Sequence, residues 1–168
     1  MTEFEPAVLV LASALRARGR RVVTAESCTG GMIAAACTAV AGSSDWFERG
    51  FVTYSNEAKT ELLGVPAALI QTHGAVSEQV ARAMAEGALR YSHADLAAAV
   101  TGIAGPTGAT PDKPVGTVWL ALAGRPGDPG LGASEDGVVT KKLAWPGARD
   151  QIRTLASWWA LKLIDEAI

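Results

Sequence analysis

The apolar positions of the chain follow two patterns, a spacing of three to four residues and short continuous runs. In residues 6–18, Val8, Leu11 and Leu15 repeat at helical spacing, whereas "RVVTA" at 21–25 is a short β-branched run. We predict helices over 6–18, 32–40, 57–64, 77–91 and 149–167, and strands at 21–25, 50–55, 95–105, 116–124 and 137–145. Strands that alternate with helices predict an α/β fold, in which helices cover a layered sheet.

The last predicted helix is apolar on more than one side. Ile152, Leu155, Trp159 and Leu163 form one apolar stripe, and Trp158 lies off it. Such a helix is either deeply buried or part of a subunit interface. Both interpretations stay open, and the second makes a homo-oligomer, specifically a dimer, an expected assembly.

Length and charge narrow the class of protein. The 168 residues are enough for one domain spanning 1–168 with a single substantial core. The 15 Lys and Arg and 17 Asp and Glu give a net charge of −2 without a basic stripe, so we expect no nucleic-acid partner.

The distribution of apolar residues argues against a membrane protein. Although 49% of the residues are hydrophobic, no apolar run reaches the roughly 18 residues of a spanning helix. The acidic start "MTEFEP" differs from the basic start of a signal peptide. We therefore expect a cytoplasmic protein without a membrane partner.

The two cysteines, Cys28 and Cys37, are nine residues apart in and beside a predicted helix. Nine helical residues rise about 13.5 Å and turn the side chains to opposite faces, which is too far for a disulfide. Neither the cysteines nor His73 and His93 have a second Cys or His at metal-ligand spacing. We expect no metal and no cofactor.

The stretch "AESCTGG" at 25–31 places Ser27, Cys28 and Thr29 between a predicted strand and a helix that starts near Gly30. Unpaired N–H groups at a helix N-terminus attract an anion or stabilise an oxyanion, and Gly30 and Gly31 let a ligand approach the backbone. Alternatively, Ser27 or Thr29 only caps the helix and Cys28 is a small buried residue. From the residues alone, both interpretations stay open.

A serine or cysteine nucleophile needs a base. His73 or His93 would complete a triad, but "SCTGG" is not the G-x-S-x-G elbow of hydrolases. Lys59 lies in the first turn of the predicted helix 57–64, where the helix dipole disfavours a cation by about 0.3–1 kcal/mol. Lowering its pKa from about 10.4 to about 7 requires roughly 4–5 kcal/mol, so a basic Lys59 must be buried. Otherwise it reaches into water.

Two further features flank this chemistry. Tyr54 ends a predicted strand five residues before Lys59, and it either orients Lys59 and passes protons or simply lines a wall. Thr101 ends a buried strand and opens the loop "GIAGPTGATPDKPVG" at 102–116, a place where α/β sheets often bind ligands. This loop is not a P-loop, because no G-K-[ST] follows at the required spacing. Its backbone can still wrap a phosphate or a carboxamide.

Taken together, six stretches resemble the CinA C-terminal domain family in order and spacing: "AESCTGG", "GSS", "TYSNEAK", "HGAVSE", "AVTGIAGPTG" and "KPVGTVWLALA". The resemblance extends from about residue 6 to 165. It implies a three-layer α/β/α sandwich with a mixed sheet. It also implies a nicotinamide mononucleotide deamidase, which hydrolyses the carboxamide of that nucleotide to nicotinate mononucleotide and ammonia without a metal.

The resemblance also implies roles for individual residues. It makes Ser27 the nucleophile, Lys59 the base and Tyr54 a third catalytic residue, and it places Thr101, Ser44 and Arg149 in the site, Arg149 near the substrate phosphate. Beside these residues we expect Thr29, Gly30, Gly31 and Gly102 to contact substrate. The backbone N–H groups of Cys28, Thr29 and Gly30 are the expected oxyanion donors.

This sequence departs from the family pattern in two places. "PGARD" has Ala148 where the family often has an acid, which leaves the role of Arg149 open. Many relatives carry an upstream nucleotide-processing domain of molybdopterin-binding type, which has a pyrophosphatase activity. We expect this chain to lack that domain, and therefore to lack the pyrophosphatase activity.

Two alternative functions remain. The first is a cysteine amidase that uses Cys28 with Lys59 and Glu26, because a thiol at a helix N-terminus has a lowered pKa. The second is a nucleotide-binding module without catalysis, in which Ser27 only caps the helix.

Overall fold

The computed structural model describes residues 2–128, 131, 134 and 136–168, and its five strands form one sheet in the order β2-β1-β3-β4-β5. The strands are β1 (Val22–Glu26), β2 (Phe47–Val52), β3 (Leu96–Gly102), β4 (Thr117–Gly124) and β5 (Val138–Ala144). β2, β1 and β3 run parallel, whereas β4 and β5 are added antiparallel. The predicted mixed sheet is confirmed.

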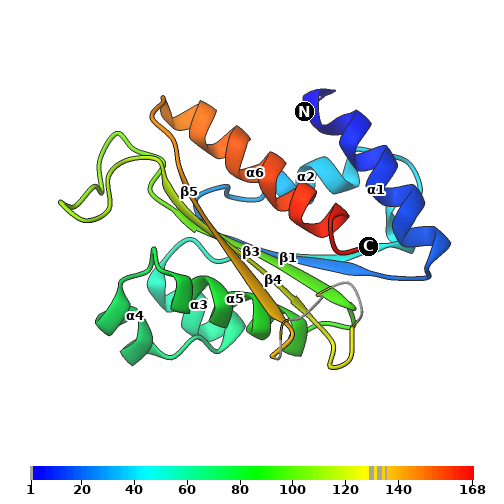
Figure 1. Ribbon diagram of the computed structural model, residues 1–168, viewed down its shortest axis with the longest axis horizontal. Coiled ribbons are helices and arrows are strands. Elements are labelled where there is room, and N and C mark those ends of the chain that lie inside the picture. Colours follow the sequence, from blue (N-terminus) through cyan, green and yellow to red (C-terminus); the bar gives the residue numbers. More distant parts are fainter. Residues whose placement is uncertain (1, 129–130, 132–133, 135) are drawn as a thin grey trace.

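Helices cover both faces of this sheet (Figure 1). One face carries α1 (Glu5–Ala17), α2 (Met32–Thr38) and α6 (Arg149–Asp165), and the other carries α3 (Asn56–Leu63), α4 (Ala67–His73) and α5 (Glu78–Arg90). Short 3₁₀ turns occupy Thr2–Phe4 (η1) and Ser43–Asp45 (η2). The three-layer α/β/α architecture is therefore confirmed.

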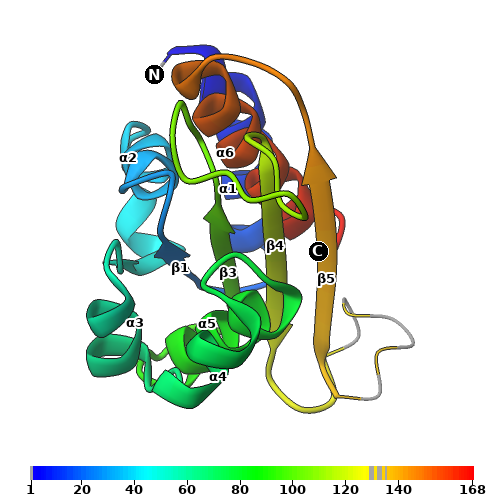
Figure 2. The same cartoon turned by 90° about the vertical axis from the view of Figure 1, so that its left-hand side faces the viewer.

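The loops after the parallel strands gather at one edge of the sheet, which lies on the left in Figure 1 and faces the viewer in Figure 2. Since the carboxyl ends of parallel strands meet at one edge, residues 27–31, 53–55 and 103–116 are brought together there. The glycine-rich loop 103–116 projects furthest from the sheet (Figures 1 and 2). This is the edge at which open α/β sheets bind ligands.

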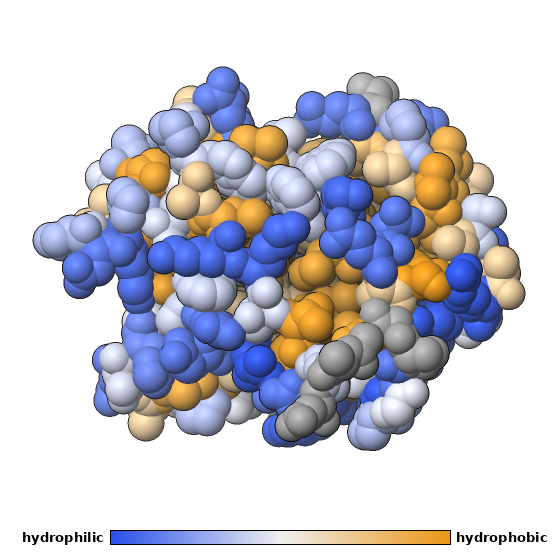
Figure 3. Space-filling view, in the orientation of Figure 1, coloured by the Kyte–Doolittle hydropathy of each residue, from blue (hydrophilic) through white to orange (hydrophobic). Residues whose placement is uncertain are grey.

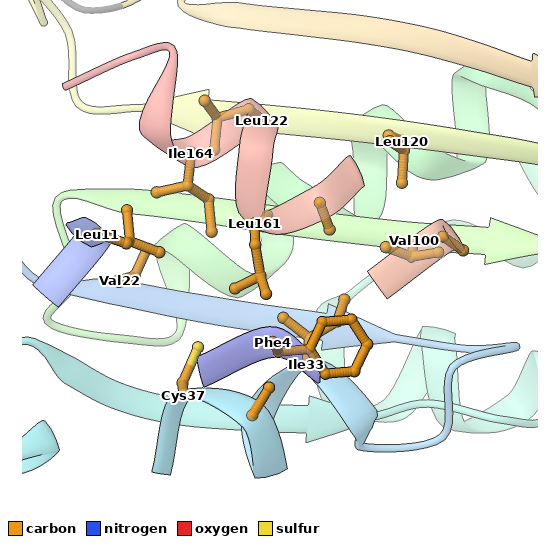
Figure 4. Packing of buried hydrophobic residues seen from close by; sticks show 14 of the residues in the cluster. Phe4, Leu11, Val22, Ile33, Cys37, Val100, Leu120, Leu122, Leu161 and Ile164 are labelled. Atoms are coloured by element: carbon orange, nitrogen blue, oxygen red, sulfur yellow. The ribbon is translucent and has the colours of Figure 1, made fainter. Parts of the chain in front are cut away.

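A large apolar core lies between the sheet and the helices α1, α2 and α6 (Figure 4). Phe4, Leu11 and Ile33 point into it from η1, α1 and α2, and Leu161 and Ile164 point into it from α6. A second cluster, which includes Val80, Met84, Ala97 and Ala99, fills the space between the sheet and α3, α4 and α5. Hydrophobic residues reach the surface in the middle of the face shown in Figure 3, where α6 and the edge strand β5 lie in Figure 1.

The predicted apolar stripe of α6 is confirmed at Ile152 and, at the margin of the core, at Trp159 and Leu163, but not at Leu155. The helix buries Ile152, Ala156, Ser157, Ala160, Leu161 and Ile164. Leu155 is 37% exposed, and Trp159 packs at the margin against Trp145 at a ring-centroid distance of 6.3 Å. The buried face also holds Ala156, Ser157 and Ala160, whose small side chains let the helix approach the sheet closely. These small residues do not stand out in an apolar pattern, so the pattern did not mark the whole buried face.

Two other boundaries differ from the expectations. β2 begins at Phe47 rather than at residue 50, and at the edge of the sheet it exposes Arg49, Gly50 and Val52, which weakens the pattern. The helix α4 was not predicted, because its seven residues follow Pro66 and carry one buried side chain, that of Ile70. Cys28 and Cys37 are both free and buried, as expected. Among the described residues, no helix is both long and apolar enough to cross a membrane.

Candidate active site

The site begins where β1 ends, at the turn formed by residues 27–31, which we call the Ser27 loop. Ser27 follows directly on Glu26, and its N–H donates to the carbonyl of Val100 on β3 at 3.0 Å. Its side chain is largely buried, with 8% of the residue exposed. The end of the sheet therefore holds the hydroxyl in place at the bottom of a pocket.

The side chain that caps the N-terminus of α2 is the carboxylate of Glu26, and not the hydroxyl of Ser27 or Thr29. Its oxygens accept the N–H groups of Gly31, Ile33 and Ala34 at 3.0, 3.1 and 2.8 Å. Gly31 occupies the N-cap position at φ 95°, a left-handed conformation that favours glycine. The expected serine or threonine cap is therefore wrong. The N-terminus of α2 is occupied by a carboxylate of the protein itself.

Lys59 reaches from α3 into the same place and is 1% exposed. Its Nζ lies 3.1 Å from Ser27 Oγ and 3.0 Å from the carbonyl oxygen of Thr53. The carbonyls of Tyr54 and Ser55 lie further away, both at 3.4 Å. Burial lowers the pKa of Lys59, while the charges of Cys28 and Glu57 act in the opposite direction. The burial that the sequence demanded of a basic Lys59 is present.

The local sequence explains how Lys59 arrives there. Ser55 caps α3 by accepting the N–H of Ala58 at 3.0 Å, as the sequence suggested. The carbonyls of residues 53–55, which leave β2, then lie within reach of a lysine one turn into the helix. The same short segment supplies both the lysine and its acceptors.

Tyr54 and Arg149 meet at the mouth of the pocket. Arg149 donates from Nη2 to the phenol oxygen of Tyr54 at 2.8 Å and from Nη1 to the carbonyl of Gly105 at 2.9 Å. Among the described residues, Arg149 has no carboxylate partner. Tyr54 is 59% exposed, and it is its backbone carbonyl, not its phenol, that lies near Lys59. The guanidinium of Arg149 therefore lies at the mouth of the pocket without an ion-pair partner among the described residues.

The far wall is formed by the end of β3. Thr101 is buried and donates its hydroxyl hydrogen to the carbonyl of Ala75 at 2.8 Å, which ties the loop before α5 to the sheet. A Cβ on Gly102 would lie 3.1 Å from Cys28 Sγ and 2.7 Å from a methyl group of Val118, so only glycine fits there. Burial raises the pKa of the Cys28 thiol to about 11.

The resulting pocket has a volume of about 300 Å³, at the lower end of the usual range for small-molecule sites. Of the predicted residues it is lined by Ser27, Cys28, Tyr54, Lys59, Thr101, Gly102 and Arg149. A hollow of about 600 Å³ lies outside α3, α4 and α5, but it contains neither a nucleophile nor Lys59. The chemistry therefore selects the smaller pocket.

Four predicted substrate contacts are not brought to this pocket. Thr29, Gly30 and Gly31 do not line it, and the Thr29 hydroxyl is buried without a hydrogen-bond partner among the described residues. Ser44 lies in η2, before β2, at the opposite edge of the sheet. The N–H of Gly30 donates to the carbonyl of Ser27 at 3.0 Å, so it is not available as an oxyanion donor.

Sequence reasoning missed two residues that lie at the site. Asn56, the first residue of α3, lines the pocket beside Tyr54. Arg153 donates from Nε to the carbonyl of Cys28 and from Nη2 to that of Thr29, both at 3.0 Å. The signal for Arg153 was its position one helical turn after Arg149, on the same side of the helix.

Other chemistry is not supported by the described part of the chain. Neither His73 nor His93 lines the pocket, which leaves a Ser–His–Asp triad without its base. Within the residues described, no group of three or more His, Cys, Asp or Glu side chains is arranged to hold a metal ion.

Comparison with known proteins identifies the family of this chain. The family model of the CinA C-terminal domain matches residues 5–168. The chain belongs to the CinA C-terminal domain family. This CinA-family domain is 42% identical to the competence/damage inducible protein CihA from Agrobacterium tumefaciens, whose crystal structure superposes with a TM-score of 0.90 over 98% of this chain and 94% of that one.

Two curated relatives differ in length. The CinA-family domain is 50% identical over 151 residues to the nicotinamide-nucleotide amidohydrolase PncC of Escherichia coli K12, covering 90% of this chain and 86% of that protein. It is 57% identical over 150 residues to a putative competence-damage inducible protein of Symbiobacterium thermophilum, covering 89% of this chain but 35% of that protein. The chain thus spans about a third of the second relative.

The Glu26→Gln variant tests the role of the carboxylate. An amide is neutral and has one acceptor oxygen, so all three N–H groups lose a charged partner and at least one of them loses its acceptor. We expect the free energy of unfolding to fall by about 2 kcal/mol, measured by urea denaturation. Glu57→Gln, an exposed acid in the first turn of α3, is the matched control and should change stability by less than about 0.5 kcal/mol. Equal stability of the two variants would contradict the proposed capping role.

Proposed function

We propose that this protein hydrolyses the carboxamide of nicotinamide mononucleotide, giving nicotinate mononucleotide and ammonia. The name of the E. coli relative supports the substrate, since that protein covers most of this chain at 50% identity. The observation that carries the reaction is the 3.1 Å contact between Lys59 Nζ and Ser27 Oγ in a buried environment. A hydroxyl beside an amine whose pKa is lowered is an activated nucleophile.

In this mechanism Lys59 begins as a neutral amine. It takes the proton of Ser27 as Oγ attacks the carboxamide carbon, and it passes that proton to the leaving nitrogen, so ammonia departs and an acyl-serine ester remains. Lys59 then takes a proton from water, whose oxygen attacks the ester, and returns it to Ser27 Oγ. The protons balance over one cycle, and no step needs a metal.

The negative charge of the tetrahedral intermediate needs hydrogen-bond donors. Cys28 lines the pocket next to the nucleophile, and the N–H groups of Cys28 and Thr29 have no hydrogen-bond partner among the described residues. We therefore propose the Cys28 N–H as the first oxyanion donor and the Thr29 N–H, whose residue does not line the pocket in this structure, as the second, rather than Gly30.

Arg149 suits the phosphate of the nucleotide. It lies at the pocket mouth and donates only to neutral oxygens, those of Tyr54 and Gly105. A phosphate is a stronger acceptor than a phenol or a carbonyl, so its arrival favours exchange of these contacts. Tyr54 then borders the opening through which the substrate enters.

The alternatives are weaker on physical grounds. A cysteine amidase needs a thiolate, but the pKa of Cys28 is raised to about 11, and Glu26 is engaged with α2. In a binding module Ser27 would cap the helix, which Glu26 does instead. A binding module would also have no use for a lysine buried at a cost in desolvation.

We also propose that the protein acts as a homodimer in the cytoplasm. Val10, Leu155 and Trp158 expose apolar surface on α1 and α6. Lys162 and Asp165 lie beside Trp158, so in a second copy turned by two-fold symmetry each of these charges can face the opposite one. A solution mass of one chain, measured by light scattering, would overturn the dimer.

The two free thiols suit a reducing compartment such as the cytoplasm.

Ammonia release in the presence of EDTA distinguishes the possible nucleophiles. Ser27→Ala should lower kcat with nicotinamide mononucleotide by about 10⁴-fold or more, because the attacking atom is lost. Cys28→Ala is the matched control and should stay within about tenfold of wild type. The opposite ranking would move the nucleophile to Cys28, and wild-type binding without turnover would favour the binding module.

The activity should rise with pH to a plateau. Protonated Lys59 cannot accept the Ser27 proton, so kcat/KM falls as pH drops through the pKa of Lys59. Burial lowers that pKa from 10.5, so the midpoint must lie below 10.5. Glu57→Gln removes a charge that raises the pKa, so its midpoint should move to lower pH. A midpoint at or above 10.5 would exclude a neutral lysine base.

Arg149→Met tests the phosphate contact by comparing two substrates. Loss of charge-assisted hydrogen bonds should raise KM for nicotinamide mononucleotide by at least about tenfold. Nicotinamide riboside, which lacks the phosphate, should show a change in kcat/KM of less than about threefold. An equal loss for both substrates would give Arg149 a structural role instead.

A further inference from the structure

Arg153 makes the contact from α6 that lies closest to the nucleophile. It binds two consecutive carbonyls of the Ser27 loop, those of Cys28 and Thr29, through Nε and Nη2. A guanidinium holds such a pair in one fixed geometry because its donors form a rigid planar fork. Arg153 has no carboxylate partner among the described residues, so these carbonyls are its partners.

The peptide groups that follow Ser27 and Cys28 are both held from their carbonyl side. The Ser27 carbonyl accepts the N–H of Gly30 at 3.0 Å, and the Cys28 carbonyl accepts Arg153 Nε at 3.0 Å. In a trans peptide the C=O and the next N–H point in opposite directions. Fixing these two carbonyls therefore fixes the directions of the Cys28 and Thr29 N–H groups, which are the two without a partner among the described residues.

We propose that Arg153 is a positioning residue for the two N–H groups that face the oxyanion formed when Ser27 attacks a carbonyl. It orients the Thr29 N–H directly, by binding the carbonyl of Cys28. It orients the Cys28 N–H through Gly30, because it also binds the Thr29 carbonyl, whose peptide group carries the Gly30 N–H that binds the Ser27 carbonyl. The proposal rests on the Ser27–Lys59 chemistry of the proposed function and adds a residue to it. Arg153 acts through the peptide groups and does not itself contact the substrate, since it does not line the pocket.

The positive charge of Arg153 favours the oxyanion in addition to the orienting effect of its hydrogen bonds. It lowers the pKa of the Cys28 thiol against the larger effect of burial, so its field reaches the residue next to the nucleophile. A cation bound to a carbonyl also polarises the peptide group, which makes the N–H a stronger donor. Both effects favour negative charge at the position of the oxyanion.

Other contacts already hold the loop in its fold. Ser27 N–H is bound to Val100, and Glu26 holds the start of α2. Removal of Arg153 should therefore leave the loop folded but loosely oriented. That expectation separates a positioning role from a purely structural one.

The test compares Arg153→Met, which keeps the apolar stem, with Arg153→Lys, which keeps the charge but not the fork. Arg18→Met, at an exposed arginine that follows α1 at the opposite end of the sheet's strands from the Ser27 loop, is the matched control. Two rates are measured for each protein: ammonia release from nicotinamide mononucleotide, and labelling of Ser27 by a fluorophosphonate followed by intact-mass spectrometry. In the labelling reaction Ser27 Oγ bonds to phosphorus, fluoride leaves, and Lys59 takes the proton.

Arg153→Met should lower kcat and the labelling rate by about 10²-fold, as expected for an impaired oxyanion donor, with KM within about twofold of wild type. Arg153→Lys should recover part of both rates, and Arg18→Met should match wild type. Wild-type rates in Arg153→Met, or a loss confined to KM, would overturn the proposal. Thermal unfolding checks that the variants are folded. If Arg153→Met is not folded, the rates of Arg153→Lys decide the test, and wild-type rates in that variant would overturn the proposal.

The two readouts separate this proposal from the proposed function. If wild type is labelled at Ser27 but releases no ammonia, the substrate assignment fails while the labelling rates still test Arg153. If wild type is not labelled at Ser27, the nucleophile and the role of Arg153 fall together.

Discussion

The geometry of the site depends on one carboxylate, that of Glu26, which accepts three N–H groups at the start of α2. Glu26 belongs to β1, so this interaction ties the end of a central strand directly to the helix that follows. The chain between them must turn within five residues. Ser27, the first of the five, is held between this turn and β3, and a hydroxyl on a freely moving loop would lack that precision.

A second constraint, the burial of Lys59, acts on the charge of the site. A protonated lysine without a carboxylate partner is poorly solvated in a protein interior, so its pKa falls. The nearby acceptors are carbonyls of residues 53–55, which are compatible with a neutral amine as well as with a cation. Burial thus favours the neutral amine of Lys59, which is the form that can accept the Ser27 proton in the proposed reaction.

Patterns along the sequence predicted the fold class, most of the elements and the pairing of a nucleophile loop with Lys59. They failed where the burial of a residue depends on packing in three dimensions: β2 lies at the edge of the sheet, α4 is short, and α6 buries alanines. Ser44 shares a motif with the family, yet nothing in its spacing says at which edge of the sheet it lies. Glu26 and Arg153 act on backbone atoms, and such contacts leave no periodic trace in a sequence.

The choice between oxygen and sulfur at adjacent positions follows from packing. Cys28 Sγ lies so close to Gly102 that a Cβ there would be 3.1 Å away, and burial raises the pKa of the thiol. Ser27 Oγ, one residue earlier, faces Lys59 instead. The neighbouring thiol is the more reactive group in water, but here it is kept protonated. In the proposed reaction it is therefore the position of the base, and not the intrinsic reactivity of the nucleophile, that determines which atom attacks.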